Sequence, residues 1–184
     1  MSTRATSGSF ALRDLTDEKR WRAAEITVSD SRRGIDADDR SGDVIVARFA
    51  LLPADIVARE SVTDDIDKIR AAVEECAGKS DILILTGGTG LGPRDVTPQA
   101  LLPLFDYEVP GMAEVMRHQG LKSTPHAMLS RQVVGVTRNC LVLSLPGSPT
   151  AVAECLDAVW PALPHALALI SGETRHAAQA SPAN

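Results

Sequence analysis

Long hydrophobic runs are missing from this 184-residue sequence. No stretch approaches the roughly 18 to 20 consecutive apolar residues that a membrane-spanning helix requires, which argues against a membrane protein. Charged residues interrupt the N-terminal segment every few positions, so it lacks the apolar core of a secretory signal. The sequence therefore predicts a cytoplasmic protein that does not bind membranes.

Runs of positive charge are also missing. The chain carries 19 Lys and Arg against 24 Asp and Glu, a formal net charge of −5. Contacts with phosphates supply most of the non-specific affinity of proteins for nucleic acids, so this composition argues against a nucleic-acid-binding protein. A small anionic ligand stays compatible with an acidic chain, provided that its site concentrates positive potential locally.

Cysteine and histidine motifs are absent as well. The three cysteines, Cys76, Cys140 and Cys155, lie in apolar stretches without a C-x-x-C motif, which is typical of reduced core thiols. The four histidines show neither i, i+4 spacing nor an H-E-x-x-H motif, so no zinc site is predicted. The chain also lacks a G-x-S-x-G nucleophile elbow, which argues against Ser/His/Asp catalysis.

Strand and helix patterns alternate along the rest of the chain. Residues 81–86, DILILT, form a continuous apolar run that is typical of a parallel strand buried on both faces. Further strands are predicted at 23–29, 55–62, 131–136 and 140–145. Helices are predicted at 45–52, 66–76, 98–105, 110–119 and 149–170, the last interrupted at Pro161 and Pro164. This order predicts an α/β fold with right-handed crossovers and helices on both faces of a mostly parallel sheet.

One domain accounts for the patterned part of the chain, residues 21–171. The two ends, residues 1–20 and 172–184, are polar and show no periodicity, so we expect both to be flexible. Ligands of such sheets bind beyond the carboxyl ends of the strands. The loops that follow the strands are therefore where a functional site is expected.

The glycine-rich segment at 86–98, TGGTGLGPRDVTP, follows the most apolar strand and precedes a helix. It contains four glycines, at positions 87, 88, 90 and 92. Their missing Cβ atoms allow backbone N–H groups to converge, and Thr97 followed by Pro98 is a favourable helix start, which together favour an anion site. The segment is not a Walker A loop, and Pro93 stands where a Rossmann fingerprint needs its third glycine. An ordinary glycine-rich turn is the simpler alternative.

Two acidic residues are expected at the same edge of the sheet as this segment. Asp95 belongs to the segment itself, and Asp64 opens the helix after the second strand. Each has an ordinary explanation, because acidic residues stabilise the first turn of a helix and Asp often caps turns. Together, and beside a phosphate-binding loop, two carboxylates favour a Mg²⁺ site that neutralises a nucleotide.

The loops after other strands add further candidates. Segment 145–149, LPGSP, follows a strand, allows close approach of the backbone at its glycine and places Ser148 at a helix start. Ser29 follows the first strand, and Ser41 and Gly42 precede the next helix. A structural N-cap explains Ser148 equally well, and such small hydroxyl clusters are weak evidence by themselves.

Five segments stand in a characteristic order: DRSG at 39–42, TGGTGLGPRDVTP at 86–98, VPGM at 109–112, AMLSR at 127–131 and LPGSPTAVAEC at 145–155. This order resembles the MoaB/Mog family of molybdenum cofactor biosynthesis proteins and the G domain of gephyrin. The resemblance implies a three-layer α/β/α sandwich with a mostly parallel sheet, assembled as a trimer or a hexamer. It also implies a molybdopterin adenylyltransferase, which uses Mg²⁺ and ATP to attach AMP to the terminal phosphate of molybdopterin and releases pyrophosphate.

The resemblance further implies roles for particular residues. Asp64 and Asp95 match the two essential aspartates of the family, which implies that they are catalytic and hold Mg²⁺. The nucleotide and its phosphates are expected at Thr86, Gly87, Gly88, Thr89, Gly90, Pro146 and Gly147. The pterin is expected at Ser29, Ser41, Gly42, Ser130 and Ser148. Arg94 and Arg131 are candidates for additional charge neutralisation, although a surface ion pair explains either arginine as well.

Two departures from the family pattern stand out. Thr63 occupies the place of a proline that normally precedes the first aspartate, and Gly120 that of a serine found in many active relatives. The missing hydroxyl at Gly120 is expected to weaken pterin binding without removing the chemistry. Both aspartates are retained, which favours the enzyme.

Some relatives bind their ligands without catalysis, so a pterin- or nucleotide-binding scaffold of the same pathway is the alternative function. A related reaction on another phosphorylated small molecule is a third. If the chain is the enzyme, its product is expected to pass to a molybdenum-insertion protein.

Overall fold

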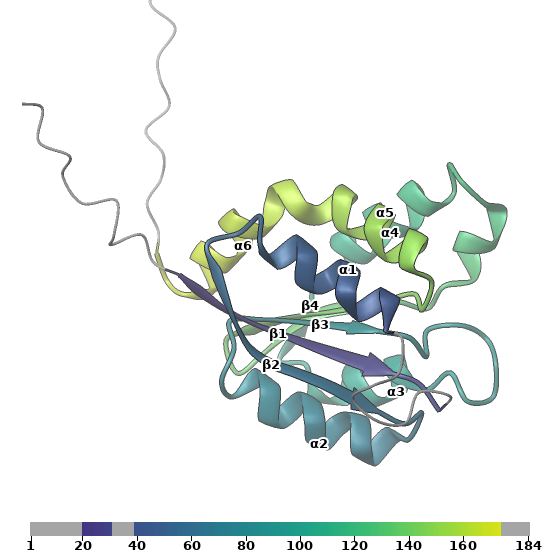
Figure 1. The fold of residues 1–184 in the computed structure, drawn as a ribbon, viewed down its shortest axis with the longest axis horizontal. Coiled ribbons are helices and arrows are strands. Elements are labelled where there is room, and N and C mark those ends of the chain that lie inside the picture. The colour runs from purple at the N-terminus through teal and green to yellow at the C-terminus, as the bar shows by residue number, and fades with distance from the viewer. Residues whose placement is uncertain (1–19, 31–38, 174–184) are drawn as a thin grey trace, which may run out of the picture.

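A six-stranded sheet forms the centre of the fold (Figure 1), as shown by a computed structural model that describes residues 20–30 and 39–173. The strands are β1 (Trp21–Val28), β2 (Ala54–Val62), β3 (Ile82–Thr86), β4 (Tyr107–Glu108), β5 (Val134–Thr137) and β6 (Cys140–Leu145). They lie side by side in the order β2-β1-β3-β6-β5-β4. The first four of these are parallel, whereas β5 pairs antiparallel with β6 and with β4. The predicted mostly parallel sheet is confirmed.

Helices cover both faces of the sheet (Figure 1). One face carries α1 (Arg40–Phe49), α4 (Pro110–Gly120), α5 (Pro149–Val159) and α6 (Leu163–Ile170), and the other carries α2 (Ile66–Ala77) and α3 (Thr97–Leu101). Short 3₁₀ helices span Leu102–Leu104, Pro125–Leu129 and Trp160–Ala162. Each face is closed by its own hydrophobic cluster. The predicted three-layer α/β/α sandwich is therefore also confirmed.

Strand β3 explains why the apolar run at residues 81–86 predicted a strand that is buried on both faces. Ile82 and Ile84 pack into the cluster under α1, while Leu83 and Leu85 pack into the cluster over α2. All four side chains are fully buried. Burial of each such side chain stabilises the fold by about 1.5 to 3 kcal/mol. Strand β3 therefore fixes the position at which the glycine-rich segment begins.

The start of α3 differs from the prediction. Val96, not Thr97, is the N-cap residue of this helix, and it makes no side-chain cap. Thr97 is already helical, and its Oγ1 donates a hydrogen bond to the carbonyl of Gly87 at 2.9 Å. The threonine therefore ties the glycine-rich segment to the helix instead of capping the helix.

Strand β5 begins later than predicted, at Val134 instead of residue 131. The side chains of Arg131 and Gln132 explain the difference. Arg131 donates to the carbonyl of Gly90, and Gln132 Nε2 lies 3.4 Å from the carbonyl of Ala113. The two residues before the strand thus make tertiary contacts that an alternation pattern does not reveal. The short strand β4 and the 3₁₀ helix Pro125–Leu129 were not predicted either.

The cysteines agree with the sequence prediction. Cys76, Cys140 and Cys155 are all free and buried. Burial is the main cause that raises the pKa of Cys76 and Cys155 to about 12, so these thiols stay protonated at neutral pH. All three cysteines belong to the hydrophobic core.

Within the described ranges, no helix combines the length and apolar character needed to cross a membrane. The flexible ends predicted at residues 1–20 and 172–184 fall almost entirely outside the described residues, so their flexibility stays a prediction.

Candidate functional site

The loops after β1, β2, β3 and β6 open onto one cavity of about 360 Å³. It is lined by Val28, Ser29, Asp30, Asp64, Gly87, Gly88, Arg94, Asp95 and Gly147. Apart from Val28, which ends β1, these residues all belong to segments that follow a parallel strand. The cavity therefore lies at the carboxyl edge of the sheet, where a ligand site was predicted.

Asp64 and Asp95 line this cavity together. Asp64 lies two residues before α2, directly before its N-cap Asp65, and Asp95 lies two residues before α3. Burial raises the pKa of Asp64, and the negative charges of Asp30 and Asp95 raise it further. The two carboxylates are therefore close enough to influence each other's charge, and both face the same cavity.

A backbone N–H holds one oxygen of each carboxylate. Asp64 Oδ2 accepts from the N–H of Asp30 at 2.9 Å, and Asp95 Oδ2 accepts from the N–H of Gly92 at 2.8 Å. The two Oδ1 atoms accept no hydrogen bond from the described part of the chain. Each side chain is thus oriented by one oxygen and retains the other for a ligand.

Gly87 and Gly88 bring the main chain to the cavity wall in a conformation that favours glycine. Their φ angles are 102° and 63°. A Cβ atom at Gly87 would lie 2.2 Å from the carbonyl oxygen of Val28, and one at Gly88 would lie 2.3 Å from Thr97 Oγ1. The N–H of Gly87 donates to the carbonyl of Leu145 at 3.1 Å, so it does not join the predicted convergence of N–H groups on an anion.

Gly90 and Gly92 make room for a side chain. A Cβ atom on either glycine would lie 2.8 Å from Asp95 Oδ2. The Asp95 carboxylate therefore occupies space that any larger residue at these two positions would fill. This packing accounts for the second pair of glycines in the segment.

Arg131 fixes the glycine-rich segment from behind. Its Nε donates to the carbonyl of Gly90 at 2.7 Å, and its Nη2 donates to the carbonyl of Asp95. Its own N–H donates to the carbonyl of Thr89 at 2.8 Å. The guanidinium thus places a permanent positive charge against the loop and holds the loop in shape.

Asp30 is a cavity residue that sequence reasoning did not assign to the site. Its Oδ1 accepts from the N–H of Asp64 at 3.0 Å, and its Oδ2 accepts from Arg94 Nη1 at 2.9 Å. The Arg94 side chain is 77 % exposed, so it lies at the rim of the cavity. The available signal was positional, because Asp30 follows β1 just as Asp64 follows β2.

Three of the seven residues expected at the nucleotide line the cavity: Gly87, Gly88 and Gly147. Thr86 and Thr89 are buried. Thr86 Oγ1 donates to the carbonyl of Pro146 at 2.7 Å, which joins the end of β3 to the loop after β6. Thr86, Thr89, Gly90 and Pro146 therefore shape the loops around the cavity without lining it.

The residues expected at the pterin are not gathered in this cavity. Ser29 lines it, whereas Ser41, Gly42, Ser130 and Ser148 do not. Ser41 is buried and donates from Oγ to the carbonyl of Gly147 at 2.8 Å. Ser130 is half-buried beside Gln132, and Ser148 is the exposed N-cap residue of α5 without a side-chain cap. Their contact with a pterin stays a prediction.

The donor atoms at the cavity fit Mg²⁺. Among residues 20–30 and 39–173, no three His, Cys, Asp or Glu side chains form a ready-made metal site. Mg²⁺ in phosphate-transfer sites usually binds one or two carboxylates and completes its shell with water and substrate phosphates. Asp64 and Asp95 fit this mode, because each presents one oriented carboxylate to the same cavity.

Both departures from the family pattern have local partners. A Cβ atom at Gly120 would lie 2.9 Å from the Cβ of Ala127, so glycine allows the end of α4 to approach the following 3₁₀ helix. The carbonyl of Thr63 accepts from the N–H of Asp65 at 2.7 Å. The turn that leads to Asp64 therefore forms with threonine at position 63.

The sequence matches a known protein family. Residues 24–165 match the family described as "Probable molybdopterin binding domain". The chain belongs to this family. The match covers nearly all of the described fold, including every segment that lines the cavity.

Named relatives support the same assignment. Molybdopterin adenylyltransferase of Helicobacter pylori is 38 % identical over 140 residues, which cover 73 % of this chain and 79 % of the relative. The molybdenum cofactor biosynthesis bifunctional protein of Synechococcus elongatus is 40 % identical over 151 residues, or 82 % of this chain and 47 % of the relative. Gephyrin of Dictyostelium discoideum is 36 % identical over 86 % of this chain, which spans only 24 % of that protein. The chain thus covers half or less of the two longer relatives.

A solved structure supports the fold. The crystal structure of MoaB from Thermus thermophilus is 43 % identical, with a TM-score of 0.75 over 83 % of this chain and 97 % of that chain. The resemblance to the MoaB/Mog family is confirmed, and the names of the relatives support a role in molybdenum cofactor biosynthesis.

Proposed function

We propose that this chain is a molybdopterin adenylyltransferase. In this reaction AMP from ATP is joined to the terminal phosphate of molybdopterin, and pyrophosphate leaves. The observation that carries the proposal is that Asp64 and Asp95, from separate loops, line one cavity beside the glycine-rich segment. Relatives 38 % and 42 % identical to this chain bear the name molybdopterin adenylyltransferase.

The chemistry places a specific demand on the cavity. The nucleophile is a phosphate monoester with a second pKa of about 6, so it is largely dianionic at neutral pH and needs no general base. The difficulty is to bring this dianion against the α-phosphorus of a triphosphate. Positioning and charge neutralisation must therefore supply the catalysis.

The charge of the cavity supports a role for a divalent cation. Asp30, Asp64 and Asp95 line it, and Arg94 at the rim offers one positive charge. This surface repels ATP as long as its carboxylates are ionised and uncompensated. When bound by Asp64 and Asp95, Mg²⁺ would neutralise oxygens of the triphosphate and lower the repulsion between the reacting groups.

The other cavity residues orient the reactants. Gly87 and Gly88 bring backbone to the cavity wall, where it can contact a phosphate. Arg131 keeps the glycine-rich segment in place, and Asp30 orients both Asp64 and Arg94. A preformed arrangement of this kind avoids the cost of ordering the loops during the reaction.

The test measures pyrophosphate released by the purified full chain supplied with molybdopterin, ATP and Mg²⁺. Asp64→Asn and Asp95→Asn should reduce turnover by several orders of magnitude while the fold stays intact. Asp67→Asn is the matched control, because Asp67 is an exposed residue in the first turn of α2 and undergoes the same change of charge. Its turnover should stay close to that of the original chain.

Two results would contradict the proposal. Near-normal release by Asp95→Asn would remove the metal-binding role. Tight binding of ATP and pterin without product would instead favour the non-catalytic scaffold. Assembly as a trimer, and transfer of the product to a molybdenum-insertion protein, belong to the same proposal, and light scattering on the purified chain tests the trimer.

A further inference from the structure

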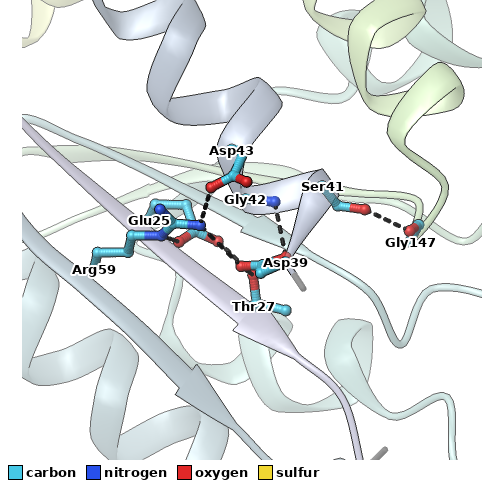
Figure 2. Close-up of polar contacts among 8 residues, drawn as sticks. All are labelled: Glu25, Thr27, Asp39, Ser41, Gly42, Asp43, Arg59 and Gly147. Atoms are coloured by element: carbon cyan, nitrogen blue, oxygen red, sulfur yellow. Dashed lines mark hydrogen bonds and ion pairs between the residues drawn. The ribbon is translucent and has the colours of Figure 1, made fainter. Parts of the chain in front are cut away.

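A second polar cluster lies between the sheet and α1 (Figure 2). Its centre is Glu25 of β1, whose side chain is 0 % exposed. The residue paired with Glu25 on β2 is Arg59, and the residue paired with it on β3 is the apolar Ile84. Asp39, the N-cap of α1, and Asp43 in the first turn approach from the helix. Among the described residues, the charged groups around Glu25 are therefore Arg59, Asp39 and Asp43.

The hydroxyl of Thr27 lies between two carboxyl groups of this cluster. Thr27 Oγ1 is 2.7 Å from Glu25 Oε1 and 2.6 Å from Asp39 Oδ2. A hydroxyl has a single proton and can donate to only one of these oxygens. The other contact is a hydrogen bond only if the carboxyl group carries a proton and donates it to Thr27. The two short contacts therefore favour one proton on Glu25 or on Asp39.

Glu25 is the better holder of this proton. Asp39 accepts from the N–H of Gly42 at 3.0 Å and from Arg59 Nη2 at 3.3 Å, both of which favour its ionised form. Glu25 Oε2 accepts no hydrogen bond within the described residues, and Arg59 Nε lies 3.4 Å away. Burial is the largest cause that raises the pKa of Glu25 to about 7. The charges of Asp39 and Asp43 also raise this pKa, whereas the hydrogen bond from Thr27 and the charge of Arg59 lower it. With a proton on Glu25, this carboxyl group would donate to Thr27, and Thr27 would donate to Asp39.

The first turn of α1 connects this cluster to the cavity. Asp39 Oδ1 holds the N–H of Gly42, and Ser41 beside it donates from Oγ to the carbonyl of Gly147 at 2.8 Å. Gly147 lines the cavity. The turn has little free space, because a Cβ atom at Gly42 would lie 2.2 Å from Asp39 Oδ2 and 3.0 Å from Glu25 Oε1. A displacement of the Asp39 or the Glu25 carboxyl group would therefore also displace the first turn of α1.

We propose that Glu25 is a positioning residue for the cavity wall. In its protonated form it donates to Thr27, Thr27 donates to Asp39, and Asp39 holds the turn whose Ser41 supports Gly147. When the proton leaves, Glu25 and Asp39 are both charged, and Thr27 can donate a hydrogen bond to only one of them. Arg59 carries a single positive charge, which cannot neutralise these two carboxylates and Asp43 as well. The turn then moves, and Gly147 moves with it. The consequence for ATP rests on the proposed function, whereas the coupling from Glu25 to Gly147 does not.

NMR titration of the isotopically labelled full chain, from about pH 5 to pH 9, tests the coupling. The Glu25 side-chain carboxyl and the amides of Gly42 and Gly147 should report one common midpoint, near the pKa of about 7. In Glu25→Gln both amides should lose this transition. In Ser41→Ala the Gly42 amide should keep it while the Gly147 amide loses it.

Two further variants keep the test decisive. Thr27→Val leaves Glu25 able to titrate but removes the hydroxyl, so Gly42 should no longer follow Glu25. Glu60→Gln is the matched control on β2, since Glu60 contacts Cys76 on the opposite face of the sheet, and it should leave all three signals unchanged. The proposal would be overturned if Glu25 titrated with a midpoint near about 4.3, the ordinary pKa of a glutamate side chain. It would also be overturned if the Gly147 amide kept its transition in Glu25→Gln.

Calorimetric binding of Mg²⁺-ATP below and above the Glu25 midpoint tests the consequence for the ligand. The affinity of the original chain should fall with rising pH by about fivefold more than that of Glu25→Gln, the low end of typical coupling between linked sites. Parallel pH dependence in the two proteins would overturn the link to the ligand. Coupled NMR transitions without ATP binding in either protein would count against the proposed function and leave the positioning role of Glu25 supported.

Discussion

Asp30 and Asp64 are joined by two reciprocal hydrogen bonds. The N–H of Asp30 donates to Asp64 Oδ2 at 2.9 Å, and the N–H of Asp64 donates to Asp30 Oδ1 at 3.0 Å. The loops after β1 and β2 are thereby locked together at the cavity. The orientation of Asp64 thus depends on a neighbour that is not itself one of the two aspartates predicted to bind the metal.

Replacing Asp30 tests this dependence. Asp30→Ala leaves the N–H of Asp64 without its acceptor and Arg94 without its ion pair, so the free energy of unfolding should fall by about 1 kcal/mol and Mg²⁺-ATP should bind more weakly. Asp30→Asn retains an acceptor oxygen and should keep most of the stability. Urea unfolding and calorimetry measure the two effects. Unchanged affinity in Asp30→Ala would mean that Asp64 does not need this support.

Arg131 offers a second test, directed at the glycine-rich segment. Its guanidinium donates to two carbonyls, those of Gly90 and Asp95, which the single ammonium of lysine cannot reproduce in the same geometry. Arg131→Lys should therefore weaken Mg²⁺-ATP binding. Arg70→Lys is the control, because Arg70 also contacts two backbone carbonyls, but at α3 and outside the cavity. Equal losses of affinity in the two variants would show that the effect is not specific to the loop.

Gly88 should not tolerate a side chain. Its φ of 63° and the 2.3 Å approach of a Cβ atom to Thr97 Oγ1 predict that Gly88→Ala costs about 1 to 3 kcal/mol of stability. At Gly111 a Cβ atom would meet nothing within 4 Å, so Gly111→Ala should be neutral or slightly stabilising. Thermal and urea unfolding of the two variants give the comparison. A Gly88→Ala variant as stable as Gly111→Ala would contradict the geometry.

The stability of the chain should depend on pH through Glu25. The folded protein raises the pKa of this carboxyl to about 7, so the folded state binds the proton more tightly than the unfolded state. This contribution is complete at acidic pH, below the ordinary pKa, and is lost as pH rises through the folded value. Relative to Glu25→Gln, the free energy of unfolding should fall by about 3 kcal/mol between acidic and mildly alkaline pH. A pH-independent difference between the two proteins in urea unfolding would exclude a raised pKa.

The fold could be predicted where a local pattern reports burial directly. The DILILT run became β3, and the apolar spacing that includes Ile45 and Phe49 became the buried face of α1. The start of β5 could not be predicted, because the side chains of Arg131 and Gln132 contact carbonyls of distant segments and the two residues do not join the strand. Such boundaries are set by tertiary contacts, which a single-sequence pattern does not contain.

The candidate site was predictable where position along the chain was sufficient. Asp64 and Asp95 follow parallel strands, so a common cavity followed from the topology. The role of Glu25 could not be predicted, because it depends on the register of β1 and β2, which places Glu25 opposite Arg59. The partner of Thr97 was likewise missed, since its hydroxyl bonds the carbonyl of Gly87 and not its own helix.

The central claim, that Asp64 and Asp95 share one divalent cation, is tested most directly by a double-mutant cycle on ATP affinity with and without Mg²⁺. Asp64→Asn and Asp95→Asn should each abolish most of the Mg²⁺-dependent affinity, and the double variant should lose little more than either alone. Losses that simply add, or a wild-type response to Mg²⁺ in Asp95→Asn, would show that the two carboxylates do not hold the same ion.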